Sequence, residues 1–461
     1  MKTECSEHTF EFEGPSRRTI TARFDGGTIS SDGGALLLYA TERRARIVER
    51  FAACFRDHRD PVRIEHSIGE LVSQRVMGLC LGYEDLCDHE SLRGDPLLCA
   101  LAGKHERDAK LAGKSTLSRL ELSTAAEAAE HRYKKTVLDT SLADRLLVDI
   151  FTESFESEPE SIVIDLDSTD FAIHGHQEGR FFHGYYDQHC YLPLYIFAGE
   201  HLLCARMRCS NIDGAAGSID EIERIVAQIR TRWTRVKITL RADSGFCREA
   251  MMAWCEENGV DYVFGLARND RLVEMIQVEL GLAQMNFAAT GEAARVFKEL
   301  EYCTRESWSR TRRVVAKAEY LSGKDNPRFV VTSLSREEID ARALYEDLYC
   351  ARGEMENRIK EQQLDLFADR VSAQTIAANQ VRLYFASIGY TLMHALRRLG
   401  LEGTALERAQ CGTIRLRLLK IGAQIKVSVR RVWVALSEAF PLQEVFALAL
   451  ARLRVANATT G

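Results

Sequence analysis

The sequence has no C-x-x-C pair and no regular spacing of cysteines. Its 13 cysteines are scattered over 461 residues, so neither a zinc ribbon nor a disulfide framework is expected. Such scattered cysteines are typical of reduced, mostly buried thiols in a cytosol. The polar, acidic start M-K-T-E-C-S-E-H is unlike a signal peptide. We therefore expect a cytoplasmic protein.

Long apolar runs and an excess of positive charge are also missing. No stretch approaches the ~18 apolar residues that a membrane span requires, so no membrane association is expected. The formal net charge is −6, which counts against a simple basic nucleic-acid binder. Any contact with DNA must then use local basic surfaces. Hydrophobic residues make up 46% of the chain and charged residues 28%, which describes a globular protein with room for several domains.

Residues 236–246 combine a strand with a carboxylate at its end. Apolar residues alternate at positions 236, 238, 240 and 242, which predicts a half-buried strand. Asp243 follows directly, and the next two residues, Ser-Gly, predict a turn. A helix over about 247–258 and a second strand over 260–266 complete a βαβ unit. A carboxylate at this strand end is well placed for chemistry, although an ordinary turn aspartate is the alternative.

A second carboxylate-bearing strand is predicted over residues 161–170. Asp165 and Asp167 share one of its faces and apolar residues occupy the other. Two apolar strands, a helix and the strand ending at Asp243 follow, at about 190–197, 202–209, 217–231 and 236–242. Three antiparallel strands followed by helix, strand, helix and strand is the order of the ribonuclease-H-like α/β fold. Asp167 then lies on the first strand and Asp243 on the fourth.

A third carboxylate is expected on a later helix packed across the sheet. Cleavage of a phosphodiester without a covalent enzyme intermediate suits two divalent metal ions held by carboxylates, and Mg²⁺ prefers such ligands. At ~100° per residue, Tyr349, Arg352 and Glu356 lie within about 60° of one another, and Lys360 joins that face. Glu354 points to the opposite side, so Glu356 is the better candidate. A solvated, charge-rich helix is the alternative.

The predicted fold class is α/β: an RNase H-like catalytic core interrupted by a β-rich insertion, with a helical N-terminal domain and a small C-terminal region. In the insertion, strands are expected near 302–309, 311–320 and 328–332, and helices resume at about 335–363 and 372–398. An earlier helix is expected at about 125–151. The tail over 414–431 holds six Lys or Arg and no acid, which fits either phosphate contacts or a solvated hairpin. The expected domains are 1–155, 156–270, 271–334, 335–398 and 399–461.

Three short motifs carry a resemblance to a known family. They are Asp167-Ser-Thr, the run R-A-D-S-G-F around Asp243, and Tyr349-x2-Arg352-x3-Glu356. These look like the acidic motifs of DDE transposases from bacterial insertion sequences, in the branch with a β-rich insertion before the glutamate helix. Matching runs also include F-F-H-G-Y-Y, C-Y-L-P-L, S-N-I-D, G-L-A-R-N and T-I-S-S-D-G-G-A. The resemblance therefore spans nearly the whole chain.

The resemblance implies a function, cofactors and partners. The protein would bind the terminal inverted repeats of its own element, free a 3′-OH by metal-dependent cleavage and join that end to target DNA. Asp167, Asp243 and Glu356 would be the catalytic residues and would hold two Mg²⁺ ions, with Mn²⁺ as a substitute. The helical domain over 1–155 is expected to bind the DNA ends. A dimer on paired ends is implied, in the bacterial cytosol and on the nucleoid when bound to DNA.

Residues beside the glutamate are expected to contact DNA. Tyr349, Arg352 and Lys360 are the candidates. The family's signature lysine stands seven residues after the glutamate, where this chain has Gln363, while Lys360 comes three residues earlier.

A DNA hairpin is a further hypothesis, because related enzymes let the freed 3′-OH attack the opposite strand. Trp308 would stack on a flipped base, with Arg312 and Arg313 as its basic neighbours. An ordinary strand aromatic is the alternative for Trp308.

Two other classes of protein share parts of this pattern. A cellular RNase H-like nuclease or junction resolvase would use the same carboxylates but is usually smaller and lacks the insertion. A catalytically silent, transposase-derived DNA-binding protein would be expected to have lost an acidic residue, and none is lost here. Inverted repeats flanking the gene would separate a mobile element's enzyme from both.

Overall fold

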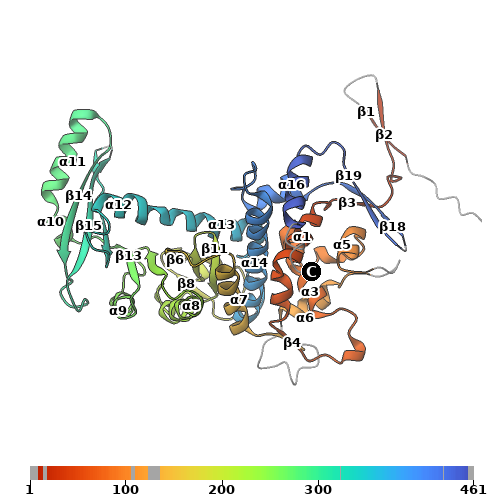
Figure 1. The fold of residues 1–461 in the computed structure, drawn as a ribbon, viewed down its shortest axis with the longest axis horizontal. Coiled ribbons are helices and arrows are strands. Elements are labelled where there is room, and N and C mark those ends of the chain that lie inside the picture. Colours follow the sequence, from red (N-terminus) through yellow and green to blue (C-terminus); the bar gives the residue numbers. More distant parts are fainter. Residues whose placement is uncertain are drawn as a thin grey trace, which may run out of the picture. The chain divides into compact units, whose positions relative to one another are not determined.

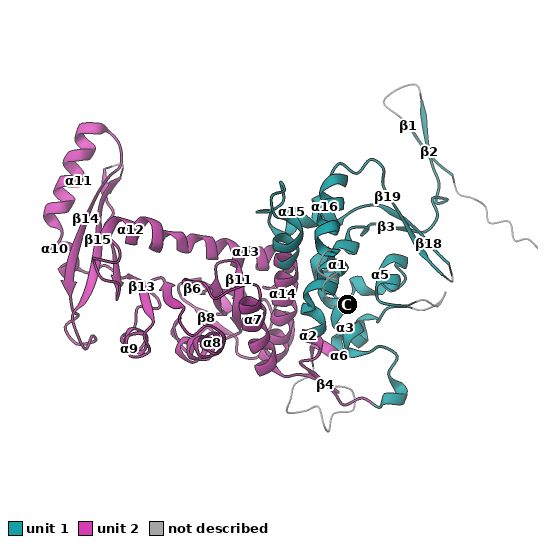
Figure 2. Cartoon of the chain, viewed as in Figure 1, with its two compact units in different colours: residues 1–49, 60–118, 395–461 teal, residues 50–59, 119–394 magenta. Residues whose placement is uncertain are grey.

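The computed structural model describes residues 9–13, 18–104, 110–122, 135–321, 323–428 and 430–454. The chain forms two compact units (Figure 2). The first consists of residues 1–49, 60–118 and 395–461, and the second of residues 50–59 and 119–394. Within the described ranges no helix is long and apolar enough to cross a bilayer.

The first unit is mainly helical. Its longest helix, α3 (Ile68–Leu81), begins at a capping box in which Ser67 and Glu70 each bond the other's backbone N–H. It ends at Gly82, whose φ of 93° favours glycine. The other helices are α1 (Ala35–Ala45), α4 (Asp88–Leu92), α5 (Pro96–Leu101), α15 (Cys411–Ile414) and α16 (Gln443–Arg454). The strands are β1 (Phe10–Glu13), β2 (Thr19–Ala22), β3 (Ile29–Ser30), β18 (Ala423–Val427) and β19 (Val432–Leu436).

The first unit joins the two ends of the chain at a pair of glycines. The N–H groups of Gly33 and Gly34 donate to the carbonyls of Ile421 and Leu419, at 2.8 and 3.0 Å. A Cβ on Gly34 would collide with the backbone of Leu419, so only glycine permits this approach. Residues expected in separate domains, 1–155 and 399–461, therefore share one unit over much of their length.

The second unit is built on a nine-stranded sheet (Figure 1). The strand order is β11-β10-β6-β12-β13-β17-β15-β14, with β16 paired to β15. β10 and β11 run antiparallel to their neighbours, while β6, β12 and β13 are parallel. The strands are β6 (Ser161–Ser168), β10 (Leu194–Ala198), β11 (His201–Arg206), β12 (Lys237–Ala242), β13 (Asp261–Leu266), β14 (Ala294–Tyr302), β15 (Arg312–Leu321), β16 (Lys324–Asp325) and β17 (Arg328–Thr332).

Five neighbouring strands, β11, β10, β6, β12 and β13, confirm the predicted fold class. Numbered along the chain, their order in the sheet is third, second, first, fourth and fifth, which is the RNase H-like order. Helices α7 (Thr140–Glu153), α8 (Ser218–Arg232) and α9 (Glu249–Glu257) pack on one face through a large apolar cluster. That cluster takes Ile162, Ile164 and Leu166 from β6. The alternating aspartates of β6 therefore point to the opposite face.

The β-rich region extends the core sheet. β17 pairs with β13 and β15 with β17, so one continuous sheet results. Its first strand is β14, Ala294–Tyr302, and the predicted strand near 302–309 is wrong because residues 303–311 form a loop. Helices α10 (Asp270–Glu274) and α11 (Gln277–Thr290) precede it.

A small separate sheet has the strand order β7-β9-β8 and contains part of the strand predicted at 190–197. The strand expected at 190–197 is divided between β9 (Gln188–Tyr191) and β10. Pro193 lies between the two, and a proline has no N–H to continue a ladder. The other strands of this sheet are β7 (Phe171–Ala172) and β8 (Phe181–His183).

The helix that carries Glu356 is continuous but changes its winding. It begins with α12 (Ala341–Ala343), passes through a π-helical turn (Leu344–Tyr349) and a 3₁₀ turn (Cys350–Arg352), and continues as α13 (Gly353–Leu366). Helix α14 (Ile376–Leu396) follows. Of the helix expected at 125–151, residues 125–134 lie outside the described residues. Its remainder forms β5 (Thr136–Leu138), which pairs with β4 (Phe55–Asp57), and most of α7.

Candidate active site

Asp167 and Asp243 stand at neighbouring strand ends. In the parallel pair of β6 and β12, Leu166 is opposite Ala242. Each aspartate is the next residue of its strand, so the two carboxylates meet at one edge of the sheet. Ile238, Leu240 and Ala242 of β12 join the same apolar cluster as the apolar side of β6. Period-2 alternation therefore directs both aspartates to the face that the cluster leaves open.

Glu356 reaches the same place from helix α13. The guanidinium of Arg352 bonds the Glu356 carboxylate at 2.8 Å and the Asp167 carboxylate at 3.3 Å. Arg352 therefore lies between two of the predicted carboxylates. Glu354 is exposed, and beside burial its negative charge helps to raise the pKa of Asp165. The structure thus brings Asp167, Arg352 and Glu356 together in the geometry that the helical spacing predicts.

The cluster is electrostatically strained. Burial raises the pKa of the Asp167 carboxyl to about 6, and the negative charges of Asp243 and Glu356 add to that rise. The nearby Arg352 cation opposes it. Burial disfavours the charged form of the Arg352 guanidinium and so lowers its pKa. The negative charges of Asp167, Glu356 and Asp243 outweigh burial, and the pKa of Arg352 is raised. The charges of Asp243 and Glu356 thus act on Asp167, and one cation, Arg352, lies among them.

These carboxylates have the chemistry of a divalent-metal site. Mg²⁺ takes hard oxygen ligands, and Asp167, Asp243 and Glu356 supply them from three elements. Among the residues that the structure describes, no three His, Cys, Asp or Glu side chains are grouped as a formed metal site. The Arg352 guanidinium bonds both Asp167 and Glu356.

Tyr349 packs directly behind Asp243. A Cβ placed on Gly265 would lie 2.5 Å from the Tyr349 hydroxyl and 2.9 Å from the backbone nitrogen of Ser244. Gly265 therefore leaves the space that Tyr349 and the turn after Asp243 occupy. Burial raises the pKa of Tyr349, the positive Arg352 lowers it and Asp243 raises it further. Tyr349 thus belongs to the carboxylate cluster, at the end of the π-helical turn, a kind of distortion frequent at functional sites.

A buried arginine, which the sequence analysis did not single out, ties the three elements together. Arg241 bonds both oxygens of Asp165, at 2.5 and 2.8 Å, and donates to the carbonyl of Leu348 at 2.5 Å. Arg241 and Asp165 are 8% and 3% exposed. They face each other across β12 and β6, two residues before Asp167 and Asp243. The run R-A-D could have indicated this residue, because Arg241 stands two residues before Asp243 and therefore points to the same face of the sheet.

The loop and turn around Asp167 are also fixed from several sides. The Ser168 hydroxyl donates to the carbonyl of Gly214 at 3.0 Å and accepts from buried Arg208 at 2.8 Å. Burial raises the pKa of Tyr186 to about 12, and the charges of Asp170 and Asp167 contribute. The F-F-H-G-Y-Y segment therefore lies beside the site.

The two candidates for a phosphate contact on α13 differ in position. Gln363 donates to the Thr169 hydroxyl and the Asp170 carbonyl, at 3.3 and 3.4 Å. It therefore lies against the segment that carries Asp167. Lys360 is exposed and stands one turn after Glu356.

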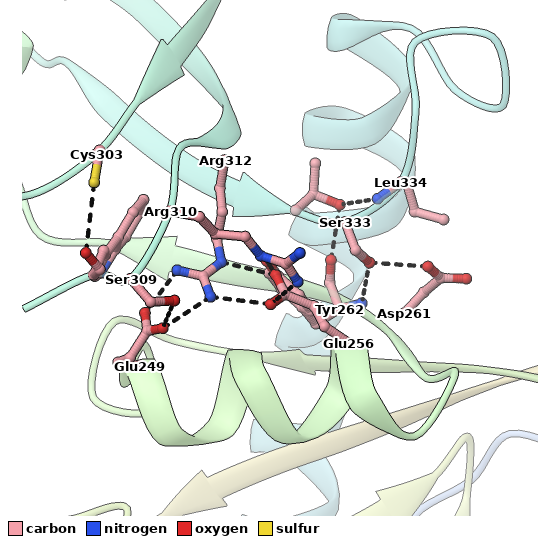
Figure 3. A network of polar contacts seen from close by, with 12 residues as sticks. Glu249, Glu256, Asp261, Tyr262, Cys303, Ser309, Arg310, Arg312, Ser333 and Leu334 are labelled. Carbon is pink, nitrogen blue, oxygen red and sulfur yellow. Dashed lines mark hydrogen bonds and ion pairs between the residues drawn. The ribbon is translucent and has the colours of Figure 1, made fainter.

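Trp308, Arg312 and Arg313 do not lie with the carboxylates. Trp308 is 9% exposed and packs edge-to-face on Tyr302, with ring centroids 5.7 Å apart. The guanidinium of Arg312 bonds Glu249 and Glu256 (Figure 3). It also lies over the Trp308 ring, 5.4 Å from the ring centroid. Arg313 bonds Glu299 and two backbone carbonyls of the Leu334–Ser335 turn. All three side chains are buried and pack this end of the sheet, which favours the ordinary strand aromatic for Trp308. A role in holding a DNA hairpin stays a prediction.

Comparison with known proteins identifies a family to which the chain belongs. A family model described as "Transposase DDE domain group 1" matches residues 12–458. No curated protein matches the chain. One solved structure that matches is the cryo-EM structure of the piggyBac transposase synaptic complex with hairpin DNA. It has 10% sequence identity and a TM-score of 0.37, and the match covers 85% of this chain and 80% of that chain. A TM-score this low carries no argument about the fold. The RNase H-like fold class of this chain rests on the order of its strands in the sheet.

Proposed function

This chain belongs to the family of transposase DDE domains, group 1, and we propose that it is a DDE transposase. It would bind the terminal inverted repeats of its insertion sequence, cleave the DNA there and join the freed ends to a target. The observation that carries the proposal is the meeting of Asp167, Asp243 and Glu356 around Arg352 on one face of an RNase H-like sheet.

The catalytic roles follow from the chemistry of these side chains. Asp167, Asp243 and Glu356 would hold two Mg²⁺ ions, or Mn²⁺ in their place, which would supply an activated attacking oxygen and a stabilised leaving oxygen. Arg352 keeps Asp167 and Glu356 in place and supplies positive charge where a phosphate would enter. Tyr349 limits the space behind Asp243. Lys360, exposed one turn further along α13, is the candidate for a phosphate contact outside the cluster.

The proposed partner is double-stranded DNA, both at the element's ends and at the target. We assign recognition of the ends to the helical part of residues 1–155, on its position and helical character. A dimer on paired ends fits the need to cut two ends in one event. The expected place of action is the bacterial cytosol, on the nucleoid when DNA is bound. Specific end binding by a protein truncated of these residues would overturn the assignment.

The test uses the gene with its native flanking DNA. Purified protein is incubated with this DNA and Mg²⁺ or Mn²⁺, beside an Asp243→Asn variant and a reaction with a chelator. Cuts at both edges of the element that require the metal and vanish in the variant would support the proposal. Specific binding without cutting would indicate a silent, DNA-binding descendant. Cutting of branched or random DNA without regard to the flanks would indicate a nuclease or resolvase.

A further inference from the structure

The hairpin of β18 and β19 projects beyond the core that supports its base. Ala423 and Ile425 pack on Leu97 in a small apolar cluster. Strand β3 pairs only with Ala423 and Gln424. Among the residues that the structure describes, no third strand lies beside the far part, residues 426–428 and 430–433, which is exposed throughout. We call these residues the distal hairpin.

The distal hairpin combines three cations with an exposed tryptophan. Lys426, Arg430 and Arg431 are exposed, and Trp433, directly opposite Lys426, is 64% exposed. No carboxylate in the described part of the chain forms an ion pair with any of these cations. Residues 411–437 contain no Asp or Glu at all. The charge of the distal hairpin is therefore wholly positive and available to a partner.

Two of the other tail cations, Arg415 and Lys420, have internal roles, whereas Arg417 is exposed outside the hairpin. Arg415 donates to the carbonyl of Cys80 at 2.9 Å, and Lys420 bonds the buried Asp32 at 2.6 Å. Only part of the basic run therefore faces solvent. Arg415 and Lys420 stabilise the first unit through these contacts, whereas the cations of the distal hairpin make no such contact in the described part of the chain.

We propose that the distal hairpin is a second DNA-contacting surface, separate from the carboxylate site, and that its partner is duplex DNA. A two-stranded β-ribbon fits a DNA groove, where flanking Lys and Arg reach phosphates. An unsupported hairpin is marginally stable in water, and an exposed tryptophan beside unpaired cations has no role in the fold. A bound duplex supplies both the counter-charge and apolar contact for Trp433. This inference rests on the proposed function, which supplies the DNA.

The experiment measures the affinity of the full-length protein for a labelled duplex carrying the element's end, over a range of salt. The triple variant Lys426→Gln/Arg430→Gln/Arg431→Gln is expected to reduce the slope of log affinity against log salt by about 2 to 3, since each phosphate contact contributes about 0.9. Trp433→Ala is expected to weaken binding with the slope unchanged, because it removes an uncharged contact. Both changes are on the surface, and unchanged thermal unfolding checks that the protein is folded.

A matched control separates a local contact from net charge. Arg408→Gln/Arg417→Gln/Arg454→Gln removes three exposed cations of the same unit that lie outside both the hairpin and residues 1–155. Equal losses in both triple variants, or no loss in the hairpin variant, would overturn the inference while wild-type end binding and cleavage leave the proposed function intact. A change in oligomeric state with unchanged DNA affinity would assign the surface to a protein partner and overturn it as well. A wild-type protein that binds no DNA would refute both proposals.

Discussion

A buried arginine that joins two strands to a helix holds its partners more firmly than a surface ion pair, because water offers it no alternative. Arg241 has this position, with both Asp165 oxygens and the Leu348 carbonyl as partners. It stands two residues before Asp243, and Leu348 stands one residue before Tyr349. Its geometry thus connects the strand ends that carry the aspartates to the helix that carries Glu356.

Replacing Arg241 by Met is expected to reduce the rate of DNA cleavage at saturating DNA by at least about tenfold, while the affinity for end DNA stays near wild type. Removing one partner of a buried pair also costs about 3–5 kcal/mol of stability. The double variant Asp165→Leu/Arg241→Met leaves no unpaired buried charge and is expected to recover most of that stability. It should not recover cleavage, because the bond to Leu348 stays broken. Wild-type cleavage by the double variant would show that the arginine only stabilises the fold.

The space beside Tyr349 gives a second prediction at the scale of one residue. Gly265→Ala places a methyl group against the Tyr349 hydroxyl and the backbone of Ser244. Overpacking of this kind costs about 1–3 kcal/mol, and we expect cleavage to fall because Tyr349 or the Asp243 turn must move. Gly281→Ala is the matched control, since a Cβ there meets nothing within 4 Å in helix α11. It should raise stability by roughly 0.5–1 kcal/mol. Thermal unfolding of both variants decides the matter, and equal effects would contradict the account.

Among the elements, the β-rich region is bound to the core by a network of charges. Arg312 of β15 bonds Glu249 and Glu256, which stand at the two ends of helix α9 (Figure 3). Burial opposes ionisation of Glu256, but hydrogen bonds from Arg312, Arg310 and Tyr262 outweigh it and lower its pKa to about 2. Strand β15 therefore depends on an ionised glutamate for its attachment.

This dependence predicts a loss of stability in acid. A glutamate has a pKa of about 4.3 in an unfolded chain, so the lowered pKa of Glu256 stabilises the fold above that value. As pH falls from about 4.3 toward 2, the unfolded state gains the proton first and this stabilisation is lost. Glu256→Gln should be less stable at neutral pH and should lose less stability over that interval. Urea unfolding at a series of pH values tests this, with exposed Glu274→Gln as control. Parallel curves for wild type and Glu256→Gln would contradict it.

Sequence patterns predicted the strands of the core well and the details of its helices poorly. Alternation with period 2 placed Asp167 and Asp243 on one face, because strand side chains must alternate. A search for 3.6-residue periodicity treats a helix as uniform, so it could not show the π-helical turn that ends at Tyr349. Local periodicity also could not show the partners of Arg241, since 76 residues separate Arg241 from Asp165 and 107 separate it from Leu348.

At the scale of the whole molecule, five consecutive domains are predicted from the sequence, and the compact units of the structure draw on segments far apart in the chain. The contact of Gly33 and Gly34 with Leu419 and Ile421 unites segments almost 400 residues apart, and no local pattern marks such a pairing. The two interpretations of Trp308 could not be separated for a related reason. A tryptophan among arginines has the same composition in a DNA-binding loop and in a packed network of ion pairs.

The central claim is that three particular carboxylates act as one metal-dependent site, and two glutamates of the same helix test it most directly. Glu356 bonds Arg352 in the cluster, whereas Glu354, two residues earlier, is exposed. The measurement is Mg²⁺-dependent cleavage of the element's ends by Glu356→Gln and Glu354→Gln, with end binding measured in parallel. The account predicts that Glu356→Gln binds but does not cut, and that Glu354→Gln cuts at close to the wild-type rate. Cleavage that survives in Glu356→Gln and fails in Glu354→Gln would contradict it.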